Sequence, residues 1–190
     1  MKTAESFPTP MPHAPLWPLT IPAYRALGEA GLIPKDTELL YGFVYKQMSK
    51  SPLHSFLLQY LHELLSNSRA AGLLVRTEQP IACSDSEPEP DLAVVKGRKE
   101  EFKADHPHTA ELVIEVCISS HDYDRSKLPA YASAGVKEVW LVLAPEKQIE
   151  VHRQPEGGQF AERIVHGPGG KLSSFTVPAF VVDLDALFAK

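Results

Sequence analysis

Three charged residues stand beside apolar runs, and their types are those that act together on phosphate esters. Asp91 follows Pro90 and opens the run LAVV, Glu115 lies inside VIEVCI, and Lys127 lies near the start of an expected helix. Burying an ionised carboxylate without a partner is costly, so the position of Glu115 indicates a nearby proton or cation. The order of acid, acid in a strand and lysine in the next helix is more informative than any one of the three.

Two carboxylates in one place favour a hard divalent cation. If the runs that hold Asp91 and Glu115 are neighbouring strands, the two acids meet at one end of a sheet, where they repel unless a proton or cation lies between them. Mg²⁺ (or Mn²⁺) prefers oxygen ligands and is often held by one or two carboxylates with water. The backbone carbonyl of Val116 would add an oxygen, and Lys127 would orient an attacking water beside a phosphate.

Each of these residues also has an ordinary structural interpretation. Asp91 fits a strand start or turn after Pro90, and Glu115 fits a structural acid paired with an arginine from another element. Lys127 taken alone fits a solvated helix residue. These alternatives stay open on the residues alone.

Strands outnumber helices among the elements that must position these residues. This indicates an α/β class, or α+β with a mixed sheet. Ser51-Pro52 begins a helix with Leu53, Leu57, Tyr60, Leu61 and Leu64 on one stripe. A polar loop is expected over 96–108 and a helix over 124–134 that ends at Gly135. A short helix is expected at 23–30, and a hairpin or a bulged strand around Gly42 at 37–47. Further strands are expected at 73–82, 91–95, 111–118, 138–144, 148–154, 159–165 and 173–180.

Composition narrows the function classes. The 190 residues carry a formal net charge of -5, which counts weakly against nucleic-acid binding because a local patch or metal overrides a global sign. Cys83 and Cys117 form no CxxC pair, so two reduced thiols are expected. No apolar run approaches the ~20 residues of a membrane span, and the expected location is the cytoplasm. A flexible, proline-rich tail is expected over 1–16 and a single domain over 17–190.

A longer set of motifs resembles a known family. The segments EPDLAVV, ELVIEV and SSHDYDRSKLPAYASAGVKEVWLVLAPEKQIEVHR resemble the Uma2 family, also called DUF820, of the PD-(D/E)XK nuclease superfamily. The most specific part runs from Asp124 to Trp140, and the resemblance extends from about Thr37 to the closing DLDALF. It implies a restriction endonuclease-like fold: a mixed central sheet flanked by helices, with additional hairpins and a divalent-metal site at one edge.

The resemblance assigns roles to individual residues. Asp91 and Glu115 match the family's metal-binding acids, while Cys117 stands where the superfamily usually has its lysine. Uma2 proteins supply that lysine from the following helix, and Lys127 matches it. On a helix, Asp124, Lys127 and Tyr131 share one face, so Asp124 and Tyr131 would buttress the lysine. Glu38 matches a further family acid that lies toward the site and would shape a second metal position.

Two departures from the family pattern bear on the site. Phe43 replaces the last glutamate of a common ELIDGE segment, which weakens the expectation of a larger acid cluster. Pro129 falls inside the expected helix and requires the helix to start near Lys127 or to bend there. Either outcome is expected to shift the lysine relative to the acids, to which catalysis is sensitive.

The resulting hypothesis is a Mg²⁺- or Mn²⁺-dependent endonuclease acting on DNA, with a two-fold homodimer as the default assembly. The alternatives are a catalytically inactive nuclease-fold module for nucleic-acid binding or dimeric assembly, and a hydrolase of small phosphate esters. One of the eight histidines, His54 in SPLHSF, resembles a histidine near the helix start in some family members. On its own it is interpreted as a residue of the capping region.

Overall fold

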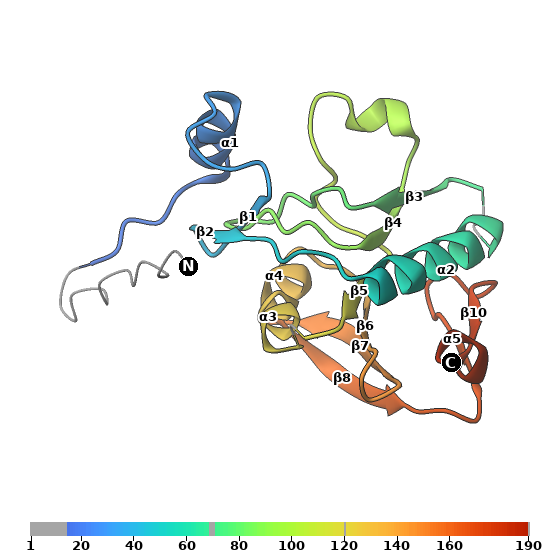
Figure 1. Cartoon of the computed structure of the whole chain (residues 1–190). Coiled ribbons are helices and arrows are strands. Elements are labelled where there is room, and N and C mark those ends of the chain that lie inside the picture. Colours follow the sequence, from blue (N-terminus) through green and yellow to red (C-terminus); the bar gives the residue numbers. More distant parts are fainter. Residues whose placement is uncertain (1–14, 69–70, 120, 190) are drawn as a thin grey trace, which may run out of the picture.

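The fold is organised around one six-stranded mixed sheet (Figure 1). The computed structural model describes residues 15–68, 71–119 and 121–189; part of the predicted tail, residues 1–14, lies outside them. The central strands are β3 (Leu73–Thr77), β4 (Leu92–Lys96), β5 (Leu112–Cys117), β6 (Glu138–Leu143), β7 (Gln148–Glu156) and β8 (Gln159–His166), in that spatial order. Only the β5–β6 pair is parallel among these neighbours. The predicted mixed sheet with flanking helices is therefore confirmed.

The other elements lie around this sheet. They are α1 (Ile21–Glu29), β1 (Thr37–Leu40), β2 (Phe43–Lys46), α2 (Pro52–Ser68), η1 (Lys99–Phe102), α3 (His121–Ser126), α4 (Leu128–Ser133), β9 (Lys171–Ser173), β10 (Val181–Asp183) and α5 (Leu184–Leu187). Within the described residues, no helix combines the length and apolar character needed to cross a membrane.

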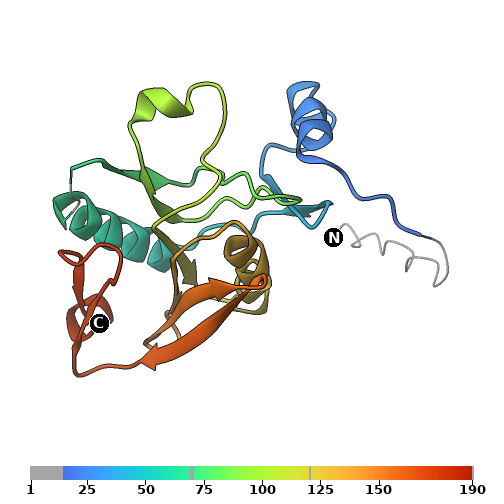
Figure 2. The same cartoon turned by 180° about the vertical axis from the view of Figure 1, so that it is seen from behind.

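The two faces of the sheet are covered by different helices, as the two opposite views show (Figures 1 and 2). Side chains alternate between the faces along a strand. On β5, Leu112, Ile114 and Val116 pack into the core that contains α2 and the C-terminal β10 and α5. Val113 and Cys117 pack into the other core, which contains α4. Because Glu115 shares the parity of Val113 and Cys117, it points toward the α4 side.

The buried face of helix α2 differs from the apolar stripe that the sequence predicted. Ser51 caps its start, accepting a hydrogen bond on Oγ from the His54 backbone N–H at 3.2 Å. Leu53 is half exposed, whereas His54 is buried with Leu57, Leu58, Leu61 and Leu65. The buried face is thus turned by one residue, which brings a histidine rather than a leucine to the sheet.

Three further predictions are corrected. The expected strand over 173–180 is strand only at Ser173, because residues 174–176 turn around Glu138 instead. The strand that begins at Leu73 ends at Thr77, where Glu78 adopts a left-handed conformation. The polar loop over 96–108 contains the 3₁₀ helix η1.

The helix expected over 124–134 is not continuous, and a helix start near Lys127 was one of the two outcomes expected from Pro129. The segment forms two helices, α3 and α4, with Lys127 at the junction and Pro129 in the first turn of α4. Proline lacks an N–H and clashes inside a helix, but it is tolerated in a first turn, so the chain breaks the helix just before it. Lys127 keeps right-handed helical angles (φ −79°, ψ −20°), which makes the break a small reorientation.

The hairpin of β1 and β2 turns at Tyr41 and Gly42, both in left-handed conformations. Gly42 (φ +78°) lies so close to the N-terminal segment that an added Cβ would stand 2.9 Å from Pro18 Cα. We expect Gly42→Ala to lower the free energy of unfolding by about 2 kcal/mol through the left-handed backbone and this clash. Thermal or urea unfolding measures the change.

A matched control for that substitution is Gly28→Ala. Gly28 lies in α1, and an added Cβ meets no atom within 4 Å. Alanine is a better helix former than glycine by about 1 kcal/mol, so Gly28→Ala should be neutral or stabilising. Equal losses of stability at the two positions would contradict the packing argument.

Candidate active site

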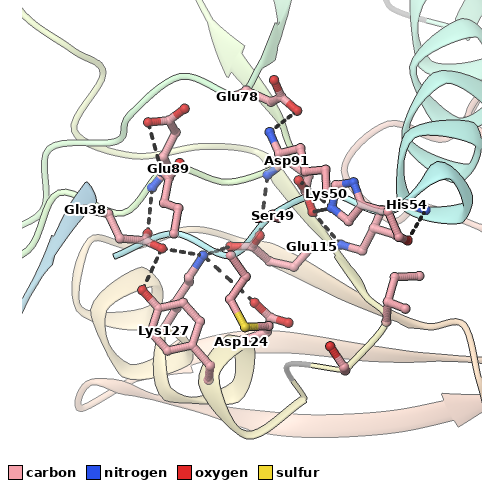
Figure 3. Close-up of a pocket in the computed structure, with 17 residues that line it drawn as sticks. Glu38, Ser49, Lys50, His54, Glu78, Glu89, Asp91, Glu115, Asp124 and Lys127 are labelled. Atoms are coloured by element: carbon pink, nitrogen blue, oxygen red, sulfur yellow. Dashed lines mark hydrogen bonds and ion pairs between the residues drawn. The ribbon is translucent and has the colours of Figure 1, made fainter. Parts of the chain in front are cut away.

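The predicted acids and lysine meet in one cavity at the end of β4 and β5 (Figure 3). The register pairs Leu92 with Ile114, so Asp91 and Glu115 are the next residues along the two antiparallel strands. The cavity has a volume of about 130 Å³. It is lined from four directions: the strand ends, the junction of α3 and α4, the β1–β2 hairpin with the linker that follows it, and the start of α2.

Asp91 is held by two donors. Its Oδ2 accepts a hydrogen bond from the Val116 backbone N–H at 2.7 Å. His54 Nε2 lies 3.1 Å from both carboxylate oxygens. The interpretation of His54 as a residue of the capping region alone is therefore incomplete, because its ring reaches from α2 to the strand end. The sequence signal that was available was its place two residues after the helix start.

Glu115 is 2% exposed and has unequal surroundings at its two oxygens. Oε1 accepts a hydrogen bond from Tyr131 Oη at 2.6 Å and lies 3.3 Å from Lys127 Nζ. Oε2 has one long contact, 3.4 Å to the Asp91 backbone N–H. The predicted alternative of an arginine partner is wrong, since the cation beside Glu115 is a lysine.

Lys127 is 4% exposed and stands among three acids, so its interpretation as a solvated residue is also wrong. Its Nζ lies 3.1 Å from Glu38 Oε1, 3.3 Å from Glu115 Oε1 and 4.0 Å from Asp124 Oδ1. The expected displacement of the lysine by Pro129 does not separate it from the acids. Asp124 also interacts with the Cys117 thiol, so Lys127 and Cys117 share a neighbour.

Glu38 is 2% exposed, and both of its oxygens are bound by donors of the chain. Oε2 accepts a hydrogen bond from the Glu89 backbone N–H at 3.0 Å. Oε1 accepts one from Tyr123 Oη at 2.7 Å and also faces Lys127. The position of Glu38 in the site agrees with the sequence prediction. Its contacts, however, make it a support for the lysine, and Tyr123 is a neighbour that sequence reasoning missed.

The charges of this cluster do not balance. Burial raises the pKa of Glu115 to about 8; Lys127 opposes this shift, and the charges of Asp91, Asp124 and Glu38 add to it. Burial lowers the pKa of Lys127, but Glu115 and Glu38 raise it more, so the ammonium stays charged. Several carboxylates thus share one lysine charge. A cavity with this excess of acid attracts a further cation.

The mixed six-stranded sheet flanked by helices defines the class of restriction endonuclease-like folds. The chain belongs to the Uma2 family, described as "Putative restriction endonuclease", which matches residues 33–185. A solved structure from Anabaena variabilis, "a putative nuclease belonging to DUF820", is similar with a TM-score of 0.73. It is 16% identical, and the match covers 90% of this chain and 98% of the other, which shows a shared fold. No curated protein matches the sequence.

Proposed function

We propose that the chain is a metal-dependent endonuclease that hydrolyses phosphodiester bonds in DNA. The observation that carries this proposal is the convergence of Asp91, Glu115 and Lys127 in one cavity whose lining has more acidic than basic side chains. Family membership supports nuclease chemistry, and the geometry supports these three residues as the groups that perform it.

The donor set fits Mg²⁺ or Mn²⁺. Within the part of the chain that the structure describes, no three His, Cys, Asp or Glu side chains form a ready-made metal cage. Mg²⁺ does not need one, because it is commonly held by one or two carboxylates with water and substrate oxygens. Asp91 and the weakly bound Oε2 of Glu115 are the carboxylate ligands we propose, with the Val116 carbonyl as a further oxygen. A divalent ion held by these groups would supply Lewis-acid chemistry, because it would lower the pKa of a bound water and polarise the phosphate.

The protein's own groups have separate tasks in this proposal. Lys127 orients the attacking water and offsets negative charge that develops on the phosphate, because its ammonium is fixed and largely desolvated. Tyr131 fixes Glu115 through its hydrogen bond, and Glu38 fixes Lys127 through their ion pair. His54 orients Asp91. A two-fold homodimer, in which each site cuts one strand, stays a prediction.

Titration calorimetry with Mn²⁺ and nicking of supercoiled plasmid DNA test this function. The wild-type protein should bind Mn²⁺ and nick DNA only when the metal is present. Asp91→Asn should weaken Mn²⁺ binding at least about tenfold and reduce nicking at least about a hundredfold, because one ligand charge is lost.

Asp122→Asn is the control, since Asp122 lies on α3 with a fully exposed side chain. It should leave both measurements unchanged. Mn²⁺ binding without nicking of DNA would favour a nuclease-fold binding module. Cleavage of small phosphodiesters without cleavage of DNA would favour the small-ester hydrolase.

A further inference from the structure

The mouth of the cavity has one exposed lysine. Of the described residues that line the cavity, the basic ones are Lys50, His54 and Lys127. Lys127 and His54 are buried, whereas the side chain of Lys50 is 39% exposed. Lys50 ends the linker 47–50, which lies along the cavity between β2 and α2 (Figure 3). It is paired there with Glu78, from the segment after β3.

The acidic lining makes this lysine important for an anionic substrate. Six acids line the cavity: Glu38, Glu78, Glu89, Asp91, Glu115 and Asp124. A divalent ion at Asp91 and Glu115 offsets charge in the interior, but Glu78 and Glu89 belong to the segment that approaches Lys50 and the linker. A nucleic-acid backbone carries one charge per phosphate and is repelled by such acids unless a cation faces it. Lys50 is the cation available at the mouth.

Helix α2 adds to the positive potential at the same place. Lys50 directly precedes Ser51, whose side chain caps this 17-residue helix. The N-terminal end of a helix carries a partial positive charge, so a lysine beside it is unfavourable unless an anion lies nearby. Pro52 has no N–H and Ser51 occupies that of His54, so the attraction is one of charge rather than of free backbone donors. In the free protein, the carboxylate of Glu78 is that anion.

The backbone holds Glu78 in this place at a cost. Its φ of 51° is in the left-handed region, which is uncommon for residues other than glycine, and its N–H donates to the Asp91 carbonyl at 3.1 Å. Backbone strain of this kind persists where the surrounding structure imposes it. Glu78 is therefore fixed next to Asp91, which directly precedes β4, and its carboxylate forms an ion pair with Lys50.

From these contacts we infer that Lys50 and the N-terminus of α2 bind a backbone phosphate next to the scissile one, and that Glu78 occupies this subsite until substrate displaces it. The inference rests on the proposed function, because it names a subsite for the same DNA substrate. When substrate binds, its phosphate replaces the Glu78 carboxylate beside Lys50. Both groups are negatively charged, so the charge of Lys50 is paired before and after binding.

Lys50→Ala tests the subsite, with Lys46→Ala as its matched control. Lys46 lies on β2, is 74% exposed, is paired with Asp36 and does not line the cavity. Both substitutions remove one charge, so long-range electrostatics change equally. Binding is measured by fluorescence anisotropy with a labelled 20-base-pair DNA duplex in Ca²⁺, over a range of salt concentrations. Lys50→Ala should raise Kd about five- to tenfold and reduce the magnitude of the slope of log K against log salt concentration by about 1. Lys46→Ala should change Kd less than about twofold.

Glu78→Gln tests the competition and should act in the opposite direction. Removing the internal anion should tighten Kd about threefold, whereas Asp36→Asn, which removes the partner of Lys46, should leave Kd within a factor of about 1.5. Equal effects of Lys50→Ala and Lys46→Ala, or unchanged or weaker binding in Glu78→Gln, would overturn the inference while wild-type nicking in Mn²⁺ still stands. Wild-type protein that neither binds the duplex nor nicks plasmid would overturn the proposed function and this subsite together.

Discussion

Lys127→Met should reduce Mn²⁺-dependent nicking of plasmid DNA at least about a thousandfold, as expected when a fixed, desolvated cation is lost from a site where charge develops. Methionine keeps much of the side-chain length and fits the buried slot, so the main change is the charge. Without the ammonium, Glu115 and Glu38 lose the cation that both contact. Initial nicking rates at saturating Mn²⁺ measure the effect, with circular dichroism to confirm the fold.

Lys137→Met is the control for this substitution. Lys137 follows α4, is half exposed, and pairs with Glu111 at 2.8 Å, outside the cavity. Its loss should leave nicking unchanged and alter stability by no more than about 1 kcal/mol. Nicking by Lys127→Met at the wild-type rate would remove this lysine from the proposed mechanism. A loss of helical signal in that variant alone would assign it a structural role.

Glu138→Ala should cause a large loss of stability, although Glu138 lies outside the cavity. The side chain is fully buried on β6, and its carboxylate joins the sheet to the turn after β9. Its two oxygens accept hydrogen bonds from Trp140, Arg153, Ser174, Phe175 and Thr176. Removing it leaves buried donors and the Arg153 charge unpaired, which we expect to lower the free energy of unfolding by about 3 kcal/mol. Differential scanning calorimetry should then show a Tm lower by roughly 10 °C.

The contribution of the Glu138 carboxylate to stability should also depend on pH. Burial raises the pKa of Glu138, but its hydrogen bonds to Ser174, Trp140 and Arg153 lower it more, so the net shift is downward. A lowered folded pKa contributes stability above the unfolded value of about 4.3, and this contribution is lost as pH falls through the folded pKa. The stability difference between wild type and Glu138→Ala should therefore shrink below about pH 4. Glu156→Ala, at an exposed position on β7, should change stability little at any pH; a loss there equal to that of Glu138→Ala would contradict the argument.

The site could be predicted in its main parts because its signals are local. Alternation and apolar runs predicted β4 and β5, and acids at defined places on two adjacent strands must meet when those strands pair. The resemblance to Uma2 proteins indicated Lys127 as the cation in place of the lysine that is absent at Cys117. The helix start at Ser51 and the turn at Gly42 could be predicted for the same reason, since each depends on one or two residues and their neighbours in the sequence.

Other features depend on contacts between segments far apart in the chain. Whether Pro129 displaces Lys127 depends on how α3 and α4 pack, and the break leaves the ammonium 3.3 Å from Glu115. The contact of His54 with Asp91 spans 37 positions, and helix periodicity alone placed a leucine on that face. Glu38 could be assigned to the site by resemblance, but only the fold showed that Tyr123 and Glu89 occupy its oxygens.

The sequence by itself predicted which side chains form the candidate site and in which segments they lie, because residue type and strand periodicity are properties of short segments. Only the tertiary structure decided how those charges are shared. Several buried carboxylates surround one ammonium, and Lys50 is paired with Glu78 at the mouth. Electrostatic energies depend on separation and burial in space rather than along the chain, so these relations followed from packing.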